Sequence, residues 1–434
     1  MHYAWVVFAT AFVTLLMAAG MRAAPGVLIE PLHRQFGWST ATIGFAVSVN
    51  VLLYGFMGPF AAALMGRFGL RRVVPGALTL VGVGAGLAAF VTQPWHLVLL
   101  WGVVVGTGTG CMASVFAATI ANRWFVARRG LVTGALVAAG GTGQVIFLQL
   151  LTRLADGPGW KWVPFAVSIG ALAGVPLVLL LLRDRPEDKG LVAYGAPADW
   201  VSPEPTRDPI RTAFRGLGIV SRSGAFWLLW GSFLVCGLST NGLIQTHFIT
   251  AAHDHGISRD GAAGLLSLVG IFDIIGTLAS GYLTDKVDPR RLLFAYYALR
   301  GLSLLFLEPL LSAGQTPLVP FIVFYGLDWV ATVPPTIALC RKVCGDEWAT
   351  VGFGWVYFGH QVGAAIAAWG AGEIRDVTGS YKLAWWIAGA CCLVAAVGTQ
   401  RIGTDRPGST PPQDPVDGPA PALAAPPERV GAPS

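Results

Sequence analysis

Residues 163–182 read VPFAVSIGALAGVPLVLLLL, twenty positions without a charged side chain, and Arg183 follows directly. An α-helix of this length spans ~30 Å, the thickness of the hydrocarbon core of a bilayer. The apolar residues are continuous rather than alternating with polar ones, which excludes a strand of a membrane barrel. The stretch therefore predicts a transmembrane helix.

Similar apolar runs occur along the chain, and the composition is 54% hydrophobic and 12% charged. Soluble domains carry about 25% charged residues, so this chain cannot cover a water-exposed surface. We expect an all-α integral membrane protein with twelve spans. They are Tyr3–Leu28, Ser39–Leu64, Val73–Val91, His96–Ala121, Gly130–Leu151, Val163–Leu182, Ala225–Ile249, Ala262–Leu283, Leu292–Ala313, Leu318–Leu339, Val351–Ala371 and Leu383–Thr399.

The basic residues of the loops predict the orientation of these spans. The loops after the even-numbered spans and the central linker carry 18 Lys and Arg residues, and the loops on the other side carry six: Arg34, Arg153, Lys161, Arg259, Arg375 and Lys382. Loops rich in Lys and Arg stay in the cytoplasm. We therefore expect a multi-pass protein of a bacterial-type inner membrane with both termini inside. Its net charge of +6 faces anionic lipid headgroups, so no nucleic-acid partner is implied.

A charged, proline-containing segment divides the spans into six and six. We predict an N-terminal six-helix bundle over 1–182, a cytoplasmic linker over 183–224 and a C-terminal six-helix bundle over 225–403. A short surface helix is expected near Thr206–Arg215. Residues 404–434 are rich in Pro and Ala without apolar periodicity, which predicts a disordered cytoplasmic tail.

The two halves repeat a loop at the same place. LMGRFGLRR at 64–72 follows the second span, and GYLTDKVDPRR at 281–291 follows the eighth. Duplicated six-helix halves indicate a transporter with a central cavity at the interface of the halves. Both loops resemble the hallmark loop of the major facilitator superfamily. The first copy departs from it, with Ala62 and Gly66 where the family usually has Gly and Asp.

A narrower resemblance is to the monocarboxylate-transporter branch, which includes bacterial oxalate–formate exchangers. It rests on YAWVV at 3–7, FGWS at 36–39, Gly58–Pro59, WFVARRGLVTG at 124–134 and GEIRDVTGSY at 372–381. The resemblance implies alternating-access transport of carboxylates, by proton symport or anion exchange. Asp273 matches the Asp that animal members carry on the eighth span, but their next-turn Arg is Thr277 here. That anion-binding Arg cannot be transferred to this chain.

Four charged residues lie well inside predicted spans: Arg22, Asp273, Arg300 and Asp328. A charge in hydrocarbon costs at least ~2.5–3.5 kcal/mol, so each needs a reason to be there. Arg22 is followed by Ala23 and Ala24, which leave space for a ligand, and a guanidinium binds carboxylates bidentately. We expect Arg22 to bind the anion. The alternative is an interfacial Arg that extends toward the membrane surface.

The two aspartates are candidates for proton coupling, because a buried carboxylate can carry a proton. Asp328 precedes Pro334 and Pro335, which should break the helix and line a cavity, so we also expect it to bind substrate. The alternative for Asp328 is a structural pair with an Arg. The alternative for Asp273 is a salt bridge to Arg300, which lies at similar depth and which we expect to form a structural ion pair.

Polar side chains inside other spans complete the candidate substrate site. They are Asn50, Gln144, Asn241, Gln245, His247, His360 and Gln361. On an ideal helix His247 shares a face with Thr240, and Gln245 shares a neighbouring face with Asn241. Such groups can orient a carboxylate or relay protons, or they can join helices by bonds worth ~0.6 kcal/mol each.

The sequence therefore predicts a secondary active transporter of small organic anions that acts as a monomer. An exporter of drugs or hydrophobic metabolites is the first alternative, with Phe116, Trp329, Trp355 and Tyr357 as an aromatic cavity. A membrane sensor is the second, although the linker and tail are too short for an output domain. We find no nucleophile–base pair and no motif for a cofactor. Only Cys340 and Cys344 have metal-ligand spacing, without further ligands, so we expect neither enzyme activity nor a metal.

Overall fold

The computed structural model describes residues 2–112, 114–197, 200 and 208–403. The predicted tail at 404–434 lies outside these residues. In the first half the helices are α1 (Tyr3–Ala18), α2 (Gly20–Phe36), α3 (Thr40–Phe68), α4 (Leu70–Ala88), α5 (Pro94–Leu97), the π-helix η1 (Val98–Val105), α6 (Gly106–Gly110), α7 (Ser114–Trp124), α8 (Arg129–Asp156) and α9 (Trp162–Leu181).

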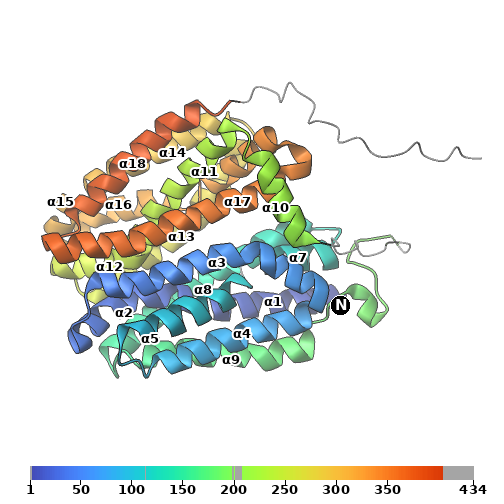
Figure 1. Cartoon of the computed structure of the whole chain (residues 1–434), viewed down its shortest axis with the longest axis horizontal. Helices are drawn as coiled ribbons and strands as arrows, with labels where there is room; N and C mark the ends of the chain where they lie inside the picture. The colour runs from blue at the N-terminus through green and yellow to red at the C-terminus, as the bar shows by residue number, and fades with distance from the viewer. Residues whose placement is uncertain (1, 113, 198–199, 201–207, 404–434) are drawn as a thin grey trace, which may run out of the picture. The chain divides into compact units, whose positions relative to one another are not determined.

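The linker region contains the short 3-10 helix η2 (Pro186–Lys189) and α10 (Pro209–Val220). The second half contains α11 (Gly224–Gly237), the π-helix η3 (Leu238–Ile244), α12 (Gln245–Asp254), α13 (Arg259–Thr284), α14 (Pro289–Leu305), α15 (Leu307–Ala313), α16 (Gln315–Asp328), α17 (Val333–Thr378) and α18 (Lys382–Gln400). Figure 1 shows these helices coloured along the chain. Within the described residues one isolated β-bridge occurs, between Phe125 and Tyr194.

The helices are long and apolar enough to cross a membrane many times. Nine spans in the described part of the chain meet that test, and α14 with α15 makes a tenth that bends by 47°. The other two predicted spans fall on the interrupted series α5–α7 and on the part of α17 beyond Gly345. The φ of Gly345 is 74°, in the left-handed region that favours glycine, and it divides α17. The prediction of an all-α membrane protein is confirmed.

The double proline of the tenth span begins a helix instead of lying inside one. Pro334 and Pro335 occupy the first turn of α17, where a missing N–H leaves no bond unmade. The chain is non-helical between Asp328 and Val333. Pro334 and Pro335 cannot donate to the carbonyls of Val330 and Ala331, but both carbonyls accept other hydrogen bonds. Val333 N donates to Val330 O at 2.9 Å, and Ser280 Oγ donates to Ala331 O at 2.5 Å.

The two halves meet directly along α3 and α17. A Cβ atom on Gly44 would lie 2.1 Å from Ala368 O, so only glycine permits this approach. At the first turn of α3, Thr40 N and Ala41 N donate to the Asp376 carboxylate at 3.1 and 2.7 Å. This carboxylate from the second half therefore caps the N-terminus of a helix of the first half.

Toward the other end of α3 the helix α10 contacts both halves. It packs on α3 and on α17, and Figure 1 shows it, in light green, beside both. Trp355 Nε1 donates to Ala213 O at 3.0 Å, and a Cβ on Gly216 would lie 2.6 Å from Val351 Cγ1. The halves thus touch directly at the Asp376 end and also through α10 at the opposite end.

Candidate substrate-binding site

A cavity of about 50 Å³ lies between the halves. Its walls come from α2, α3, α6, η3, α12 and α17, so both halves contribute. The lining residues are Met21, Arg22, Pro25, Val47, Asn50, Val51, Tyr54, Thr109, Asn241, Gln245, Thr246 and Gln361. Five of the predicted site residues therefore share one cavity: Arg22, Asn50, Asn241, Gln245 and Gln361.

Arg22 brings the positive charge into this cavity. It lies in the first turn of α2, and its side chain is exposed because it faces the cavity. The guanidinium carbon lies 5.6 Å from the centroid of the Tyr54 ring, a cation–π contact. Within the described part of the chain, no carboxylate pairs with Arg22 at ion-pair distance.

Close backbone packing holds Arg22 in place. A Cβ on Gly26, one turn further along α2, would lie 2.8 Å from Gln245 O. The helix that carries Arg22 therefore rests directly on α12, which carries Gln245. In this conformation the backbone contact therefore brings the guanidinium and the amide to the same cavity.

Amide groups supply hydrogen-bond donors around the guanidinium. Gln144 Nε2 donates to Gln245 Oε1 at 2.5 Å, which leaves Gln245 Nε2 pointing elsewhere. Gln245 Nε2 and Gln361 Nε2 are buried and have no hydrogen-bond partner among the described residues. Asn50 Nδ2 is occupied, since it donates to Trp101 O at 2.7 Å. Arg22 and the two glutamines thus offer donors to a ligand rich in acceptor oxygens.

The two predicted histidines are not among the residues that line the cavity. His247 is fully buried, with Nε2 at 2.9 Å from Ala368 O and Nδ1 at 3.0 Å from Tyr381 Oη, so both ring nitrogens are engaged. His360 is also buried, and its ring stacks on Tyr357 with the centroids 5.7 Å apart. His360 Nδ1 has no hydrogen-bond partner in the described part of the chain.

Arg300 pairs with Asp328 and not, as one alternative held, with Asp273. Arg300 Nε donates to Asp328 Oδ2 at 2.5 Å, and Nη2 donates to Asp328 O at 2.6 Å. Arg300 Nη1 also lies 3.1 Å from Cys236 Sγ. Both partners are buried, with side chains 0% and 4% exposed. This arrangement matches the structural alternative for Asp328, which is not among the residues that line the cavity.

Asp273 has no cationic partner within ion-pair distance among the described residues. Its Oδ1 accepts hydrogen bonds from Thr277 Oγ1 and from Val330 N, each at 3.0 Å. Thr277, at the position where animal relatives carry an Arg, thus bonds to the aspartate. Asp273 also satisfies a backbone N–H in the break between α16 and α17.

Tyr54 and Thr109 also line the cavity, although neither was predicted from the sequence. Tyr54 could have been found, because Val47, Asn50, Val51 and Tyr54 recur at the spacing of one helix face. Thr109 follows the π-helix η1, so no regular helical spacing points to it.

Residues 10–368 and 242–428 match the Major Facilitator Superfamily. The chain belongs to this superfamily. It is 29% identical to monocarboxylate transporter 13 of Rattus norvegicus over 91% of this chain and 87% of that protein. It is 24% identical to the uncharacterized MFS-type transporter YcxA of Bacillus subtilis over 87% of this chain and 90% of that protein. The predicted resemblance to the monocarboxylate-transporter branch is confirmed.

A solved structure shows the fold. The crystal structure of a D-xylose–proton symporter superposes with a TM-score of 0.71 at 16% identity, covering 94% of this chain and all of that one. The predicted fold of twelve helices is confirmed, and the protein is a multi-pass membrane transporter. In this architecture substrates bind near the midplane between the halves. The cavity around Arg22 occupies that interface in the transporter.

Proposed function

We propose that the transporter carries small organic anions of the monocarboxylate kind by alternating access. The single observation that carries the proposal is Arg22, which faces the cavity between the halves without a carboxylate partner among the described residues. A carboxylate would meet the guanidinium through two parallel hydrogen bonds, the arrangement that Arg favours. The relatives named monocarboxylate transporters support the same substrate class.

The side-chain amides of the cavity would bind the oxygen atoms of the anion that Arg22 does not reach. Gln245 Nε2 and Gln361 Nε2 would donate to further oxygens of the substrate, and Asn241 would complete the wall contributed by η3. Each neutral hydrogen bond contributes ~0.5–1.5 kcal/mol. Gln144 would not contact the substrate itself, but its hydrogen bond to Gln245 orients that amide.

We assign proton coupling to Asp273 within this proposal. Arg300 already balances the charge of Asp328, whereas Asp273 has only neutral hydrogen-bond partners, Thr277 and the Val330 N–H, among the described residues. A proton on Asp273 would accompany the anion and neutralise the charge carried across the membrane. Anion exchange is the form of transport expected if no carboxylate takes up a proton.

The proposal includes the predicted setting. The transporter would lie in a bacterial-type inner membrane as a monomer, with the bundles 1–182 and 225–403 joined by a cytoplasmic linker at 183–224. In that topology the Asp376 end of α3 faces outward, and the described conformation is held closed on the outside.

Binding to purified protein tests the substrate class. We expect small monocarboxylates to raise the melting temperature and their uncharged primary amides to leave it unchanged, because only the acid pairs with Arg22. The paired compounds have nearly the same shape, so shape is controlled. Stabilisation by hydrophobic cations or by the amides alone would instead favour the drug exporter.

A further inference from the structure

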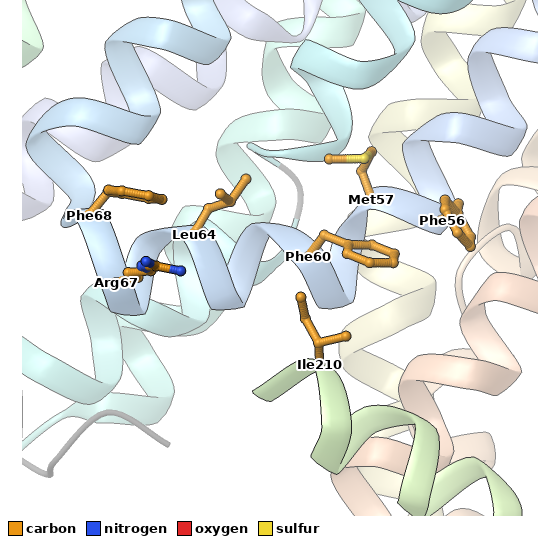
Figure 2. Close-up of a pocket in the computed structure, with 7 residues that line it drawn as sticks. All are labelled: Phe56, Met57, Phe60, Leu64, Arg67, Phe68 and Ile210. Atoms are coloured by element: carbon orange, nitrogen blue, oxygen red, sulfur yellow. The ribbon is translucent and has the colours of Figure 1, made fainter. Parts of the chain in front are cut away.

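An apolar groove with a volume of about 400 Å³ follows the second half of α3. Its wall on α3 consists of Phe56, Met57, Phe60, Leu64, Arg67 and Phe68. Figure 2 shows Ile210 of α10 opposite Phe60, with Arg67 and Phe68 at the far end of α3. The groove is separate from the cavity around Arg22, because the two share no lining residue.

The lining of the groove suits a hydrocarbon chain. Six of its seven side chains are apolar, and Phe56, Phe68 and Ile210 are 39%, 46% and 39% exposed. From Phe56 to Phe68 the helix rises ~18 Å at 1.5 Å per residue. One leaflet contributes ~15 Å, half of the hydrocarbon core. An acyl chain that follows α3 would therefore fill the groove over its length.

The end of the groove suits a phosphate. Arg67 lies in the last turn of α3, with its guanidinium carbon 5.4 Å from the centroid of the Phe68 ring. No carboxylate pairs with Arg67 within the described part of the chain, and the groove has no acidic lining residue. Arg71, Arg72 and Arg211 are exposed on the adjoining segments. A basic surface of this kind attracts anionic rather than zwitterionic headgroups.

We propose that this groove binds one anionic phospholipid, with an acyl chain along α3 and its phosphate on Arg67. In the predicted topology the lipid comes from the cytoplasmic leaflet. The bound chain would occupy the space between α3 and α10, the helix that joins α3 to α17. This site does not depend on the proposed substrate, so transport activity and lipid binding are separate measurements.

Native mass spectrometry of the delipidated full-length transporter tests the site. We expect one phosphatidylglycerol to bind more tightly than phosphatidylethanolamine of the same chain length. Arg67→Gln should weaken phosphatidylglycerol binding about fivefold, the factor that ~1 kcal/mol per basic residue represents. Ile210→Ser should also weaken it, because one wall of the groove loses its apolar side chain.

Matched variants on the same elements serve as controls. Arg72 is an exposed Arg that does not line the groove, and Ile219 lies on α10 with 37% exposure, close to that of Ile210. Arg72→Gln and Ile219→Ser should bind the lipid as the wild type does. Equal affinity of the wild type and Arg67→Gln, or equal retention of the two lipids, would overturn the proposal. All four substitutions lie at exposed positions, and a thermal melt of each checks that it folds.

Discussion

At Arg22 the free-energy cost of placing a charge in the membrane can be compared with the interactions that stabilise it. Placing a guanidinium in the membrane costs at least ~2.5–3.5 kcal/mol. Arg22 faces the cavity, which lowers that cost, and the contact with the Tyr54 ring returns ~0.5–2 kcal/mol. Within the described residues no carboxylate pairs with the guanidinium, so it can bind an anion, which is why we place the substrate at this residue.

Replacing Arg22 tests that argument directly. Arg22→Ala should abolish binding of an anionic substrate and leave folding intact, because the side chain has no ion-pair partner to strand among the described residues. Arg22→Lys should restore part of the affinity, since it keeps the charge and loses the bidentate geometry. Thermal-shift titration with a monocarboxylate measures both, with Arg153→Ala, an exposed Arg outside the cavity, as the control. Wild-type affinity in Arg22→Ala would make Arg22 an interfacial anchor.

Single residues also show where sequence reasoning stops. The depth of Arg300, Asp273 and Asp328 in the membrane follows from their positions in apolar runs. Depth alone does not say which way a side chain points around its helix. Arg300 lies at a depth that suits either aspartate, and only the packing of α14 against α16 selects Asp328.

Among the helices, the non-helical segment between α16 and α17 is bonded both to Asp273 and to Arg300, the partner of Asp328. Arg300 Nη2 donates to the carbonyls of Asp328 and Trp329, and Asp273 accepts from Val330 N. The non-helical segment is therefore held from α13 and α14 together. Asp273 thus fixes this segment through a hydrogen bond, and Arg300 fixes it through two.

Asparagine variants separate coupling from stability. In Asp273→Asn the Oδ1 atom can still accept both hydrogen bonds, so the fold should persist while proton-driven accumulation is lost. Exchange of anion for anion should remain, since it needs only the loaded carrier to cross. Asp328→Asn should lower the melting temperature strongly, because breaking a buried pair costs ~3–5 kcal/mol.

The measurement pairs pH-gradient-driven uptake with counterflow for both variants, together with a melt of each. If Asp273→Asn accumulates substrate as the wild type does, this carboxylate does not carry the proton. If Asp328→Asn is as stable as the wild type, its pair with Arg300 contributes little.

The elements themselves were largely predictable. Continuous apolar runs predicted the helices, because only a helix satisfies its own backbone in lipid. On the seventh span Asn241 and Gln245 both line the cavity, as their shared helix face predicted, although residues 238–244 form a π-helix. His247 lies away from the cavity because residues two apart on α12 point to nearly opposite sides of the helix.

At the scale of the whole molecule, the predicted topology decides how the conformation is interpreted. Asp376 caps α3 across the halves, and Arg375 Nη1 of the second half donates to Thr40 Oγ1 of the first half at 2.9 Å. These contacts cluster at one end of the bundle. If that end faces outward, the transporter is closed to the outside and its next step opens these contacts.

A set of reporters tests the orientation. A fusion after Arg222 or at Thr404 should report the cytoplasm, and an insertion near Asp254 should report the outside. The expectation follows from the excess of Lys and Arg in one set of loops. A periplasmic signal from the linker would reverse the topology, and the conformation would then be closed to the cytoplasm.

Uptake into proteoliposomes tests the central claim, transport of small organic anions, most directly. Purified transporter is reconstituted and offered labelled monocarboxylates, their uncharged amides and a hydrophobic cation, with and without an inward proton gradient. The account predicts saturable uptake of at least one monocarboxylate, absent in Arg22→Ala liposomes, and no uptake of the amides or the cation. Uptake of the cation, or monocarboxylate uptake at the wild-type rate by Arg22→Ala, would contradict it.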